Sequence, residues 1–529
     1  MMEYLVTQAE MKQYDSNTIT HLKMPSVVLM ERAALVTVEL LMKELGAAAY
    51  RVLVVAGCGN NGGDGFAIGR LLLLQGCRVD FVLLGSREKC SEETALQIDI
   101  LERYGHSPFD RIPEGEYDIV IDAIFGIGLS RETEGIYREA VCALNRMHSY
   151  VCAVDIPSGV HAGSGQILGC AVQADLTVTY GFFKLGQFLY PGAGCCGKIL
   201  CGQMGIDEHG FLGKKPGFYT YTSSEDVRLP ARRPDGNKGT FGKVLVIAGS
   251  ETICGAALMA GRSVFRTGAG MVRIVSARQN RETLQQALPE AMLTIYDTAF
   301  WAKEEPDAGF AAAFREAHDW ADCILIGPGI GKGKAARWLL EQCLCESGLP
   351  LVIDADGLNL LVEKTYEKEG GQFIQEMVRQ RMLHPERKII LTPHLGEFSR
   401  LFGCSIPEAS QNLTDYPKEL ADRLHCIVVC KDARTVVACP DKEQIYLNTS
   451  GNAGMATAGS GDVLAGMITG LLAQGMEAEE AAVCGVYLHG AAGDMAARVH
   501  GERSMTAADI IEQLPRVFRA VEEGEEKTL

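Results

Sequence analysis

The sequence predicts an α/β protein with two domains, each built around a largely parallel β-sheet. Its 529 residues exceed the size at which one hydrophobic core stops growing, so at least two domains are expected. Apolar, β-branched runs alternate with helix-length segments in both halves of the chain, which is typical of parallel sheets with helical crossovers. With 47% hydrophobic and 22% charged residues, the composition is that of a folded globular protein.

The first half begins this alternation at its first clear apolar run. Strands are predicted over 51–56, 78–84, 118–124 and 150–154, and a helix is predicted over 66–74. Strands that are separated by helix-length connections pair in parallel, with right-handed crossovers. Open sheets of this type bind ligands at the carboxyl ends of their strands.

The second half restarts the alternation after a stretch rich in Gly, Pro and charged residues around 207–242. Strands are predicted there over 243–250, 323–329, 350–357, 388–394 and 426–432, followed by a Gly- and Ala-rich helical pattern from 451 to 500. These strands are continuously apolar, as expected when helices cover both faces of a sheet. We therefore predict a first domain over 1–215, a linker over 216–236, a second domain over 237–520 and a solvated tail over 521–529.

Charge and composition exclude several functional classes. The net charge of −17 disfavours a nucleic acid as the main partner, because phosphates require an excess of Lys and Arg. No apolar run is long enough to span a membrane, and the N-terminus carries acidic residues where a signal peptide is basic and apolar. The 18 cysteines include no CxxC pair, so we expect reduced thiols, no zinc site and a cytoplasmic location.

A glycine-rich loop, GCGNNGGDG over 57–65, follows the first strand. Glycines allow a phosphate to approach the backbone, and the N-terminus of the next helix attracts anions. The pattern GxGxxG alone also fits an ordinary strand–helix turn. Two more loops carry Asp122 and Asp155 at the ends of apolar strands. One such aspartate is often only a cap, but three loops of this kind in one domain favour a ligand site.

The motifs GNNGGDG, DAIFGIGL and DIPSGV, in this order, resemble the NAD(P)H-hydrate epimerase family over residues 1–215. The resemblance implies a Rossmann-like three-layer domain, with Asp155 as acid–base group and Lys184 as a second catalytic group. It implies a potassium ion at Asn61, Asp122 and Ser158. Substrate contacts are implied for Asp155 and for Asn60, Asn61, Gly62, Gly63, Asp64, Gly126, Ile127, Gly128, Leu129, Ser130, Arg131 and Glu132.

The segment GNAGMATAGSGDVLAG over 451–466 carries the strongest signal in the second half. Small residues lead into an apolar helix, so the N–H groups of residues 459–461 can form a cradle for a phosphoryl group. Asp462 then lies where it can take a proton from an attacking hydroxyl. The alternative is that Asp462 only caps the helix. Lys431 and His394 also follow strands, although a lone histidine is more often structural.

The motifs GPGIG, DADGLN, TPHLGEF and GNAGMATAGSGDVLAGM resemble the ribokinase-like superfamily, and within it the ADP/ATP-dependent NAD(P)H-hydrate dehydratases, from about 238 to 518. The resemblance implies a ribokinase-like α/β domain with Asp462 as the base. Hydrate contacts are implied for Ala256, Gly331, His394 and Asp462, and nucleotide contacts for Lys431, Asp432, Ala433, Arg434, Thr435 and Gly461. Ser460 and Asp432 stand where Thr and Gly are frequent in the family, and Asp432 puts local nucleotide affinity in doubt.

Together these resemblances imply a lyase and isomerase that repairs hydrated NADH and NADPH. The expected ligands are both hydrates (NADHX and NADPHX) and ADP, with K⁺ in the first domain, Mg²⁺ accompanying the nucleotide, and a homo-oligomeric assembly. No motif fixes the magnesium ligands. The alternative is a sugar or hydroxymethylpyrimidine kinase fused to a nucleotide-binding module, which would release a stable phosphorylated product. A dehydrogenase is disfavoured, because no acidic residue follows the second strand where ribose recognition requires one.

Overall fold

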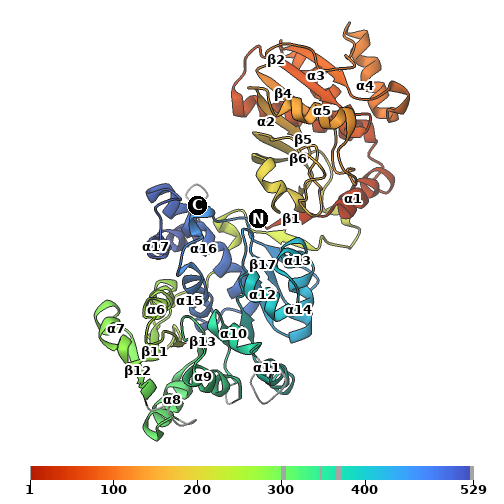
Figure 1. Ribbon diagram of the computed structural model, residues 1–529. Coiled ribbons are helices and arrows are strands. Elements are labelled where there is room, and N and C mark those ends of the chain that lie inside the picture. The colour runs from red at the N-terminus through yellow and green to blue at the C-terminus, as the bar shows by residue number, and fades with distance from the viewer. Residues whose placement is uncertain (1, 300–305, 346–347, 364–371, 525–529) are drawn as a thin grey trace. The chain divides into compact units, whose positions relative to one another are not determined.

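The computed structural model describes residues 2–299, 306–345, 348–363 and 372–524. The chain divides into two compact units, one of residues 3–219 and one of residues 220–529 together with residues 1–2. Figure 1 labels the helices and strands of both units along the chain. Within the described ranges, no helix is both long and apolar enough to span a bilayer.

The first unit contains a six-stranded sheet in which every neighbouring pair is parallel. Its spatial order is β3 (Arg78–Leu83), β2 (Arg51–Ala56), β4 (Ile119–Ala123), β5 (Tyr150–Val154), β6 (Leu176–Tyr180) and β8 (Lys198–Gly202). A separate parallel pair joins β1 (Glu3–Val6) to β7 (Phe183–Lys184). Strand β3 lies on one side of β2, and the next strand, β4, lies on the other side. The carboxyl ends of β2 and β4 therefore flank a topological switch point.

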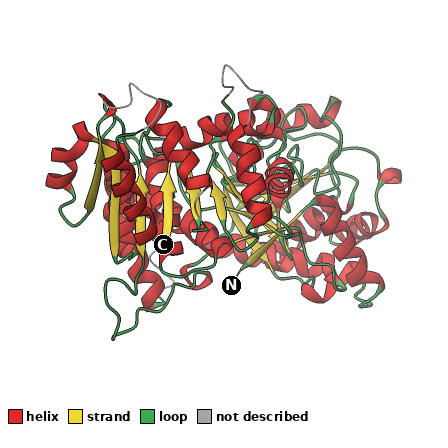
Figure 2. Cartoon of the chain, turned by 90° about the horizontal axis from the view of Figure 1, so that it is seen from below, coloured by secondary structure: helices red, strands yellow, loops and turns green. Residues whose placement is uncertain are grey.

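Helices cover both faces of this sheet. Figure 2 shows the helices of the chain in red and its strands in yellow. They are α1 (Gln8–Thr20), α2 (Ser26–Leu45), α3 (Asn60–Leu74), α4 (Glu92–Arg103) and α5 (Gly135–Leu144). Alternate residues of β2 enter two different cores: Val52 and Val54 pack with α2, α3 and α4, whereas Leu53 and Val55 pack with α5. This two-sided burial produces the three-layer, Rossmann-like arrangement that was predicted.

The second unit is built on strands in the order β12, β11, β10, β13, β14, β15, β16, β17 and β18, all parallel except for the antiparallel β17 and β18. Their bounds are β10 (Lys243–Ile247), β11 (Met271–Ala277), β12 (Met292–Tyr296), β13 (Cys323–Ile326), β14 (Leu351–Ile353), β15 (Ile389–Leu391), β16 (Ile427–Cys430), β17 (Val436–Ala438) and β18 (Ile445–Leu447). The switch point lies between β10 and β13. The predicted α/β fold class is confirmed for both units.

The helices of the second unit are α6 (Gly255–Thr267), α7 (Arg281–Ala287), α8 (Ala308–Trp320), α9 (Lys334–Cys345), α10 (Asp356–Leu361), α11 (Gln372–Leu383), α12 (Leu395–Phe402), α13 (Ile406–Gln411), α14 (Tyr416–Leu424), α15 (Ser460–Ala473), α16 (Ala478–His500) and α17 (Ala507–Glu523). The predicted linker, 216–236, contains β9 (Phe218–Thr220) and the buried residues Ser224 and Val227. Helix α17 continues to Glu523 within the predicted tail, and residues 525–529 lie outside the described residues.

Two helices begin earlier than the sequence pattern predicted. Helix α3 starts at Asn60, so the segment Asn60–Asp64 forms its first turn rather than a free loop. Helix α15 starts at Ser460, so Asp462 lies within its first turn. Glycine has a low helix propensity and weakens the helical pattern in a sequence, which is why these first turns were not predicted as helix.

Close packing of α15 on α6 depends on Gly466. A Cβ atom at this position would lie 2.0 Å from the Ser263 hydroxyl and 2.5 Å from the carbonyl oxygen of Ala260. We expect Gly466→Ala to lower the unfolding free energy of the second unit by about 1–3 kcal/mol, because the two helices must separate. The measurement is the denaturant midpoint of that unit, with Gly255→Ala as control, since a Cβ there meets no atom within 4 Å. An unchanged midpoint in Gly466→Ala contradicts this packing.

Two candidate active sites

The first unit contains a cavity of about 550 Å³ at the switch point between β2 and β4. Eleven of the predicted residues line it: Asn60, Asn61, Asp64, Gly126, Ile127, Gly128, Leu129, Ser130, Arg131, Asp155 and Lys184. Gly62, Gly63, Glu132, Asp122 and Ser158 do not line it. Gly62 and Gly63 are buried within α3, and Glu132 is exposed beyond the cavity loop.

The glycine loop brings the N-terminus of α3 against the loop after β4. The N–H of Gly57 donates to the carbonyl of Ala123 at 3.1 Å, and a Cβ on Gly57 would lie 2.2 Å from the carbonyl oxygen of Ile124. Only glycine permits this approach. The first-turn N–H groups at Asn60 and Asn61 have no carbonyl to bond within the helix, so they face the cavity as anion donors.

Asp155 and Lys184 form a buried ion pair at the cavity wall. The Lys184 ammonium donates to Asp155 Oδ1 at 2.5 Å, to Thr179 Oγ1 at 2.8 Å and to the carbonyl of Tyr180 at 2.9 Å. Lys184 is fully buried. Asp155 has a φ of +67°, a conformation that costs free energy for a non-glycine residue. The Gln187 side chain donates to the carbonyl of Asp155 at 2.7 Å and helps to hold it there.

Two further carboxyl groups share this cavity. Burial raises the pKa of Asp64 well above its ordinary value, and the negative charge of Asp155 raises it further. The pKa of Asp15, on α1, is raised by burial and by Asp155 in the same way. The cavity therefore holds an aspartate paired with a lysine beside a carboxyl group whose pKa is raised, a combination suited to proton exchange on a bound ligand.

The predicted potassium ligands lie behind the cavity wall. Asp122 is fully buried and is the fourth residue of β4, rather than the first residue of a loop. Its Oδ1 accepts from the Ser158 hydroxyl at 2.6 Å, and burial raises its pKa to about 6. The amide nitrogen of Asn61 is buried without a hydrogen-bond partner among the described residues. Carboxylate, hydroxyl and amide oxygens are suitable ligands for a hard cation, so this set fits the predicted ion.

Two of the four predicted hydrate contacts, Ala256 and Gly331, lie in segments that follow β10 and β13, the strands that flank the switch point. Ala256 lies in the first turn of α6, which follows β10, and Gly331 lies in the GPGIG loop that follows β13. The two loops are joined by a hydrogen bond from the N–H of Gly249 to the carbonyl of Pro328, at 2.8 Å. The side chain of Asp356 accepts from the N–H of Gly331 at 2.9 Å and fixes that loop.

The N-terminus of α15 carries the predicted base. Gly459 caps the helix with a φ of +91°, and Gly461 and Asp462 occupy its first turn. Burial raises the pKa of Asp462 to about 7, and the charges of Asp354 and Asp356 act in the same direction. A carboxyl group with such a pKa both accepts and releases a proton near neutral pH, which is the property of a general base in group transfer.

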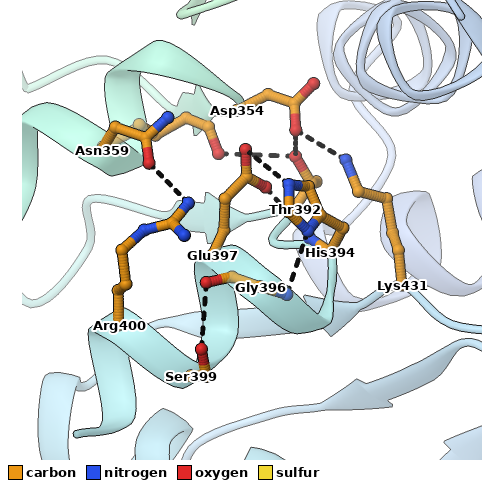
Figure 3. Close-up of polar contacts among 10 residues, drawn as sticks. Asp354, Asn359, Thr392, His394, Gly396, Glu397, Ser399, Arg400 and Lys431 are labelled. Carbon is orange, nitrogen blue, oxygen red and sulfur yellow. Dashed lines mark hydrogen bonds and ion pairs between the residues drawn. The ribbon is translucent and has the colours of Figure 1, made fainter. Parts of the chain in front are cut away.

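Lys431, at the end of β16, forms an ion pair with Asp354 (Figure 3). Its ammonium donates to Asp354 Oδ1 at 2.7 Å, and Thr392 donates to the same oxygen at 2.7 Å. Burial opposes the charge of Lys431, but Asp354 and Glu397 raise its pKa above the ordinary value. Among the other predicted nucleotide contacts, Asp432 and Ala433 are exposed, Arg434 donates to the carbonyl of Thr449, and Thr435 accepts from Asn448.

His394 has a structural role at the start of α12. Its Nδ1 accepts from the N–H of Gly396 at 3.0 Å, and Glu397 accepts from the N–H of His394 at 3.0 Å, a capping box. Burial and the nearby Lys431 lower the pKa of His394, so the ring is neutral. Burial raises the pKa of Glu397 to about 7. The imidazole remains 58% exposed, so Nε2 is accessible to a ligand.

Sequence reasoning did not assign Asp15 or Asp354 to either site. Asp15 lies on α1, far from the three motif loops in the sequence, and only its place on the cavity wall identifies it. Asp354 belongs to the DADGLN motif, but its partner Lys431 lies 77 residues away. Among the described residues, no group of three His, Cys, Asp or Glu side chains is arranged to hold a metal ion.

Two protein-family models match this chain. The model described as NAD(P)H-hydrate dehydratase matches residues 244–516, and the model described as YjeF-related protein N-terminus matches residues 26–186. The bifunctional NAD(P)H-hydrate repair enzyme Nnr of Moorella thermoacetica is 34% identical over 98% of this chain and 97% of that protein. The Nnr protein of Escherichia coli is 32% identical over 90% of this chain and 89% of that protein.

Solved structures are similar to the second half of the chain. The ADP/ATP-dependent NAD(P)H-hydrate dehydratase of Bacillus subtilis, co-crystallised with ATP and Mg²⁺, is 30% identical and has a TM-score of 0.45. It matches 56% of this chain and 96% of its own. A ribokinase-like superfamily protein of Enterococcus faecalis is 27% identical over 58% of this chain and 96% of its own, with a TM-score of 0.47.

Proposed function

The chain belongs to the family of bifunctional NAD(P)H-hydrate repair enzymes, and from this premise we propose how its two sites divide the reaction. The first unit interconverts the R and S hydrates of NADH and NADPH. The second unit dehydrates the S hydrate with ADP and releases AMP and phosphate. The observation that carries this division is that each unit has its own carboxyl group at a candidate site: Asp155 lines the cavity of the first unit, and Asp462 lies in the first turn of α15 in the second.

In the first unit, Asp155 and Lys184 perform the epimerisation. The hydroxyl leaves the ring carbon as water while the lone pair of the ring nitrogen forms a C=N bond, and a water molecule then adds to the other face of the ring as Asp155 takes its proton. Lys184 orients Asp155 through its ammonium, which lies 2.5 Å from Asp155 Oδ1. Asp64, whose pKa is raised well above its ordinary value by burial, supplies a proton to the departing hydroxyl. The N-terminus of α3, with Arg131 on the cavity wall, binds the phosphates of the dinucleotide.

In the second unit, the hydrate hydroxyl attacks the terminal phosphorus of ADP. Asp462 takes the hydroxyl proton, and AMP leaves with the electron pair of the broken P–O bond. Phosphate then leaves the ring with the C–O electron pair, and the adjacent carbon loses a proton, which restores the double bond. The first-turn N–H groups of α15 stabilise the charge on the transferred phosphoryl group. Mg²⁺ accompanies the nucleotide phosphates.

We propose ADP as the preferred nucleotide and Lys431–Thr435 as its contacts. Support comes from the position of Lys431 beside the N-terminus of α15, where the phosphates must lie. Initial rates of dehydration with ADP and with ATP, each with Mg²⁺, are the test. A higher kcat/KM with ADP is expected, and a higher kcat/KM with ATP overturns the preference without affecting the reaction class.

Asp122, Ser158 and Asn61 are proposed to hold a potassium ion in the first unit. We expect Asp122→Asn to abolish the stimulation of epimerisation by K⁺ and the rise in melting temperature that K⁺ produces. The same stimulation should weaken as pH falls through about 6, because Asp122 then becomes protonated and loses the negative charge that attracts the cation. Asp80→Asn, which neutralises a carboxyl group elsewhere in the same sheet, is the control. Equal stimulation of wild type and Asp122→Asn contradicts this assignment.

We infer a cytoplasmic, homo-oligomeric enzyme. All 18 cysteines are free thiols, which is typical of a reducing compartment. The apolar side chains of Val27, Val28 and Leu35 on α2 are exposed, and a second copy of the chain can cover them. Light scattering of the purified protein tests the assembly, and a monomeric mass contradicts it.

A further inference from the structure

Asp354 is held rigidly at the carboxyl end of β14. Its side chain is almost fully buried, and its N–H donates to the carbonyl of Ile326 at 3.0 Å. The carbonyl of Asp354 accepts from the N–H of Gly357 at 2.9 Å, and the next residue, Ala355, has a φ of +46°. From this backbone the carboxylate points toward Thr392 and Lys431, which both donate to its Oδ1 (Figure 3).

The ion pair lies against the first turn of α15. A Cβ on Gly461 would lie 3.1 Å from the Lys431 ammonium and 3.9 Å from Asp354 Oδ2. The residue after Gly461 is the base Asp462. Both charges of the pair are therefore beside the phosphoryl cradle and the base, although Asp354 comes from β14 and Lys431 from β16.

We propose that Asp354 is a positioning residue of the dehydratase, which fixes the Lys431 ammonium at the phosphoryl cradle and places its carboxylate beside the first turn of α15 that carries Asp462. This inference rests on the proposed dehydration with ADP. Lys431 is a flexible side chain, and a carboxylate with one orientation confines its ammonium to the place where phosphoryl charge develops. Asp354 touches neither substrate in this account and acts through Lys431 and Asp462.

Three charged side chains near Asp462 shift its pKa, and each shifts it in a defined direction. Asp354, at the end of β14, and Asp356, on α10, raise its pKa, whereas Lys431, on β16, lowers it. Glu397, on α12, faces Lys431 rather than Asp462. On α16, His489 contacts Ser460, and burial lowers the pKa of its imidazole to about 4, so it carries no charge near neutral pH.

The pH dependence of kcat for dehydration, at saturating ADP and S hydrate, tests the inference. We expect Asp354→Asn to move the acidic limb down by about one pH unit, because a negative charge beside Asp462 is lost. We expect Lys431→Gln to move it up by about one pH unit, because the charge of Asp354 is then unopposed. Plateau rates should fall about tenfold or more in both variants, since the phosphoryl charge loses a positioned ammonium.

A double variant and a matched control complete the experiment. Asp354→Asn with Lys431→Gln removes both charges of the ion pair, so this variant should be more stable than Asp354→Asn alone, and its acidic limb should return close to the wild-type position. Thr392→Val removes the neutral hydrogen bonds to Asp354 Oδ1 and to the carbonyl of Ile353 without changing a charge, and it should leave the acidic limb unchanged. The inference is overturned if the acidic limb of the pH profile in Asp354→Asn stays at the wild-type position. It is also overturned if the acidic limb of the double variant moves as far as that of Lys431→Gln alone. Absence of ADP-dependent dehydration in the wild type would instead overturn the proposed function.

Discussion

Replacing Asp462 with asparagine is expected to lower the rate of dehydration by about 10²- to 10⁴-fold, the range for loss of a general base. The asparagine is nearly isosteric and retains the helix start at Ser460, so nucleotide binding should persist. Epimerisation in the first unit should continue at the wild-type rate and provides an internal control for folding. The measurement is the recovery of reduced-nicotinamide absorbance from the pure S hydrate with ADP.

The wild-type reaction should also depend on the ionisation of Asp462. Burial and Asp354 raise its pKa to about 7, and only the deprotonated form can accept the hydroxyl proton. The rate should therefore rise with pH through about 7 and fall as pH decreases below it. Full activity of Asp462→Asn, or a rate independent of pH between about 5 and 8, contradicts its assignment as the base.

The second large effect is expected for Asp155→Asn, which should lower the rate of epimerisation by about 10²- to 10⁴-fold. Dehydration of the pure S hydrate should be unchanged. This variant leaves the Lys184 ammonium buried without its carboxylate, which costs about 3–5 kcal/mol of stability. Asp155→Asn combined with Lys184→Met removes both charges and should show the same loss of epimerisation in a more stable protein.

A matched control separates proton transfer from packing at this site. Thr179→Val removes the hydrogen bond from the Thr179 hydroxyl to Asp155 Oδ1, 3.1 Å long, without changing a charge. We expect it to retain most of the epimerisation rate. Wild-type epimerisation in Asp155→Asn, measured as interconversion of the two separated hydrates, would remove Asp155 from the mechanism.

The sequence predicts best the strands that are continuously apolar. Strands such as β2 and β10 were found because buried parallel strands consist of uninterrupted β-branched residues. Strand β6 was not predicted, because its buried threonines Thr177 and Thr179 interrupt the apolar run. These hydroxyls are buried with hydrogen-bond partners, which depend on the folded structure and leave no periodic signal.

The site residues that could be predicted were also those with a local signal in the sequence. Motif loops at strand ends identified Asp155 and Asp462, because the sheet topology brings such loops together. Contacts between residues far apart in the sequence could not be predicted. Asp354 pairs with Lys431, 77 residues away, and Asp15 lines the first cavity from a helix that carries no motif. The pKa changes of Asp64 and Glu397 arise mainly from burial, which depends on tertiary packing.

The most direct test of the two-site account mixes both hydrate epimers of NADPH with the protein, Mg²⁺, K⁺ and ADP, and follows reduced-nicotinamide absorbance. Wild type should restore all of the absorbance, Asp155→Asn only the S fraction with a slow remainder, and Asp462→Asn almost none. No recovery by the wild type with either ADP or ATP, together with a stable phosphorylated product from another small alcohol, would contradict the account and favour a small-molecule kinase.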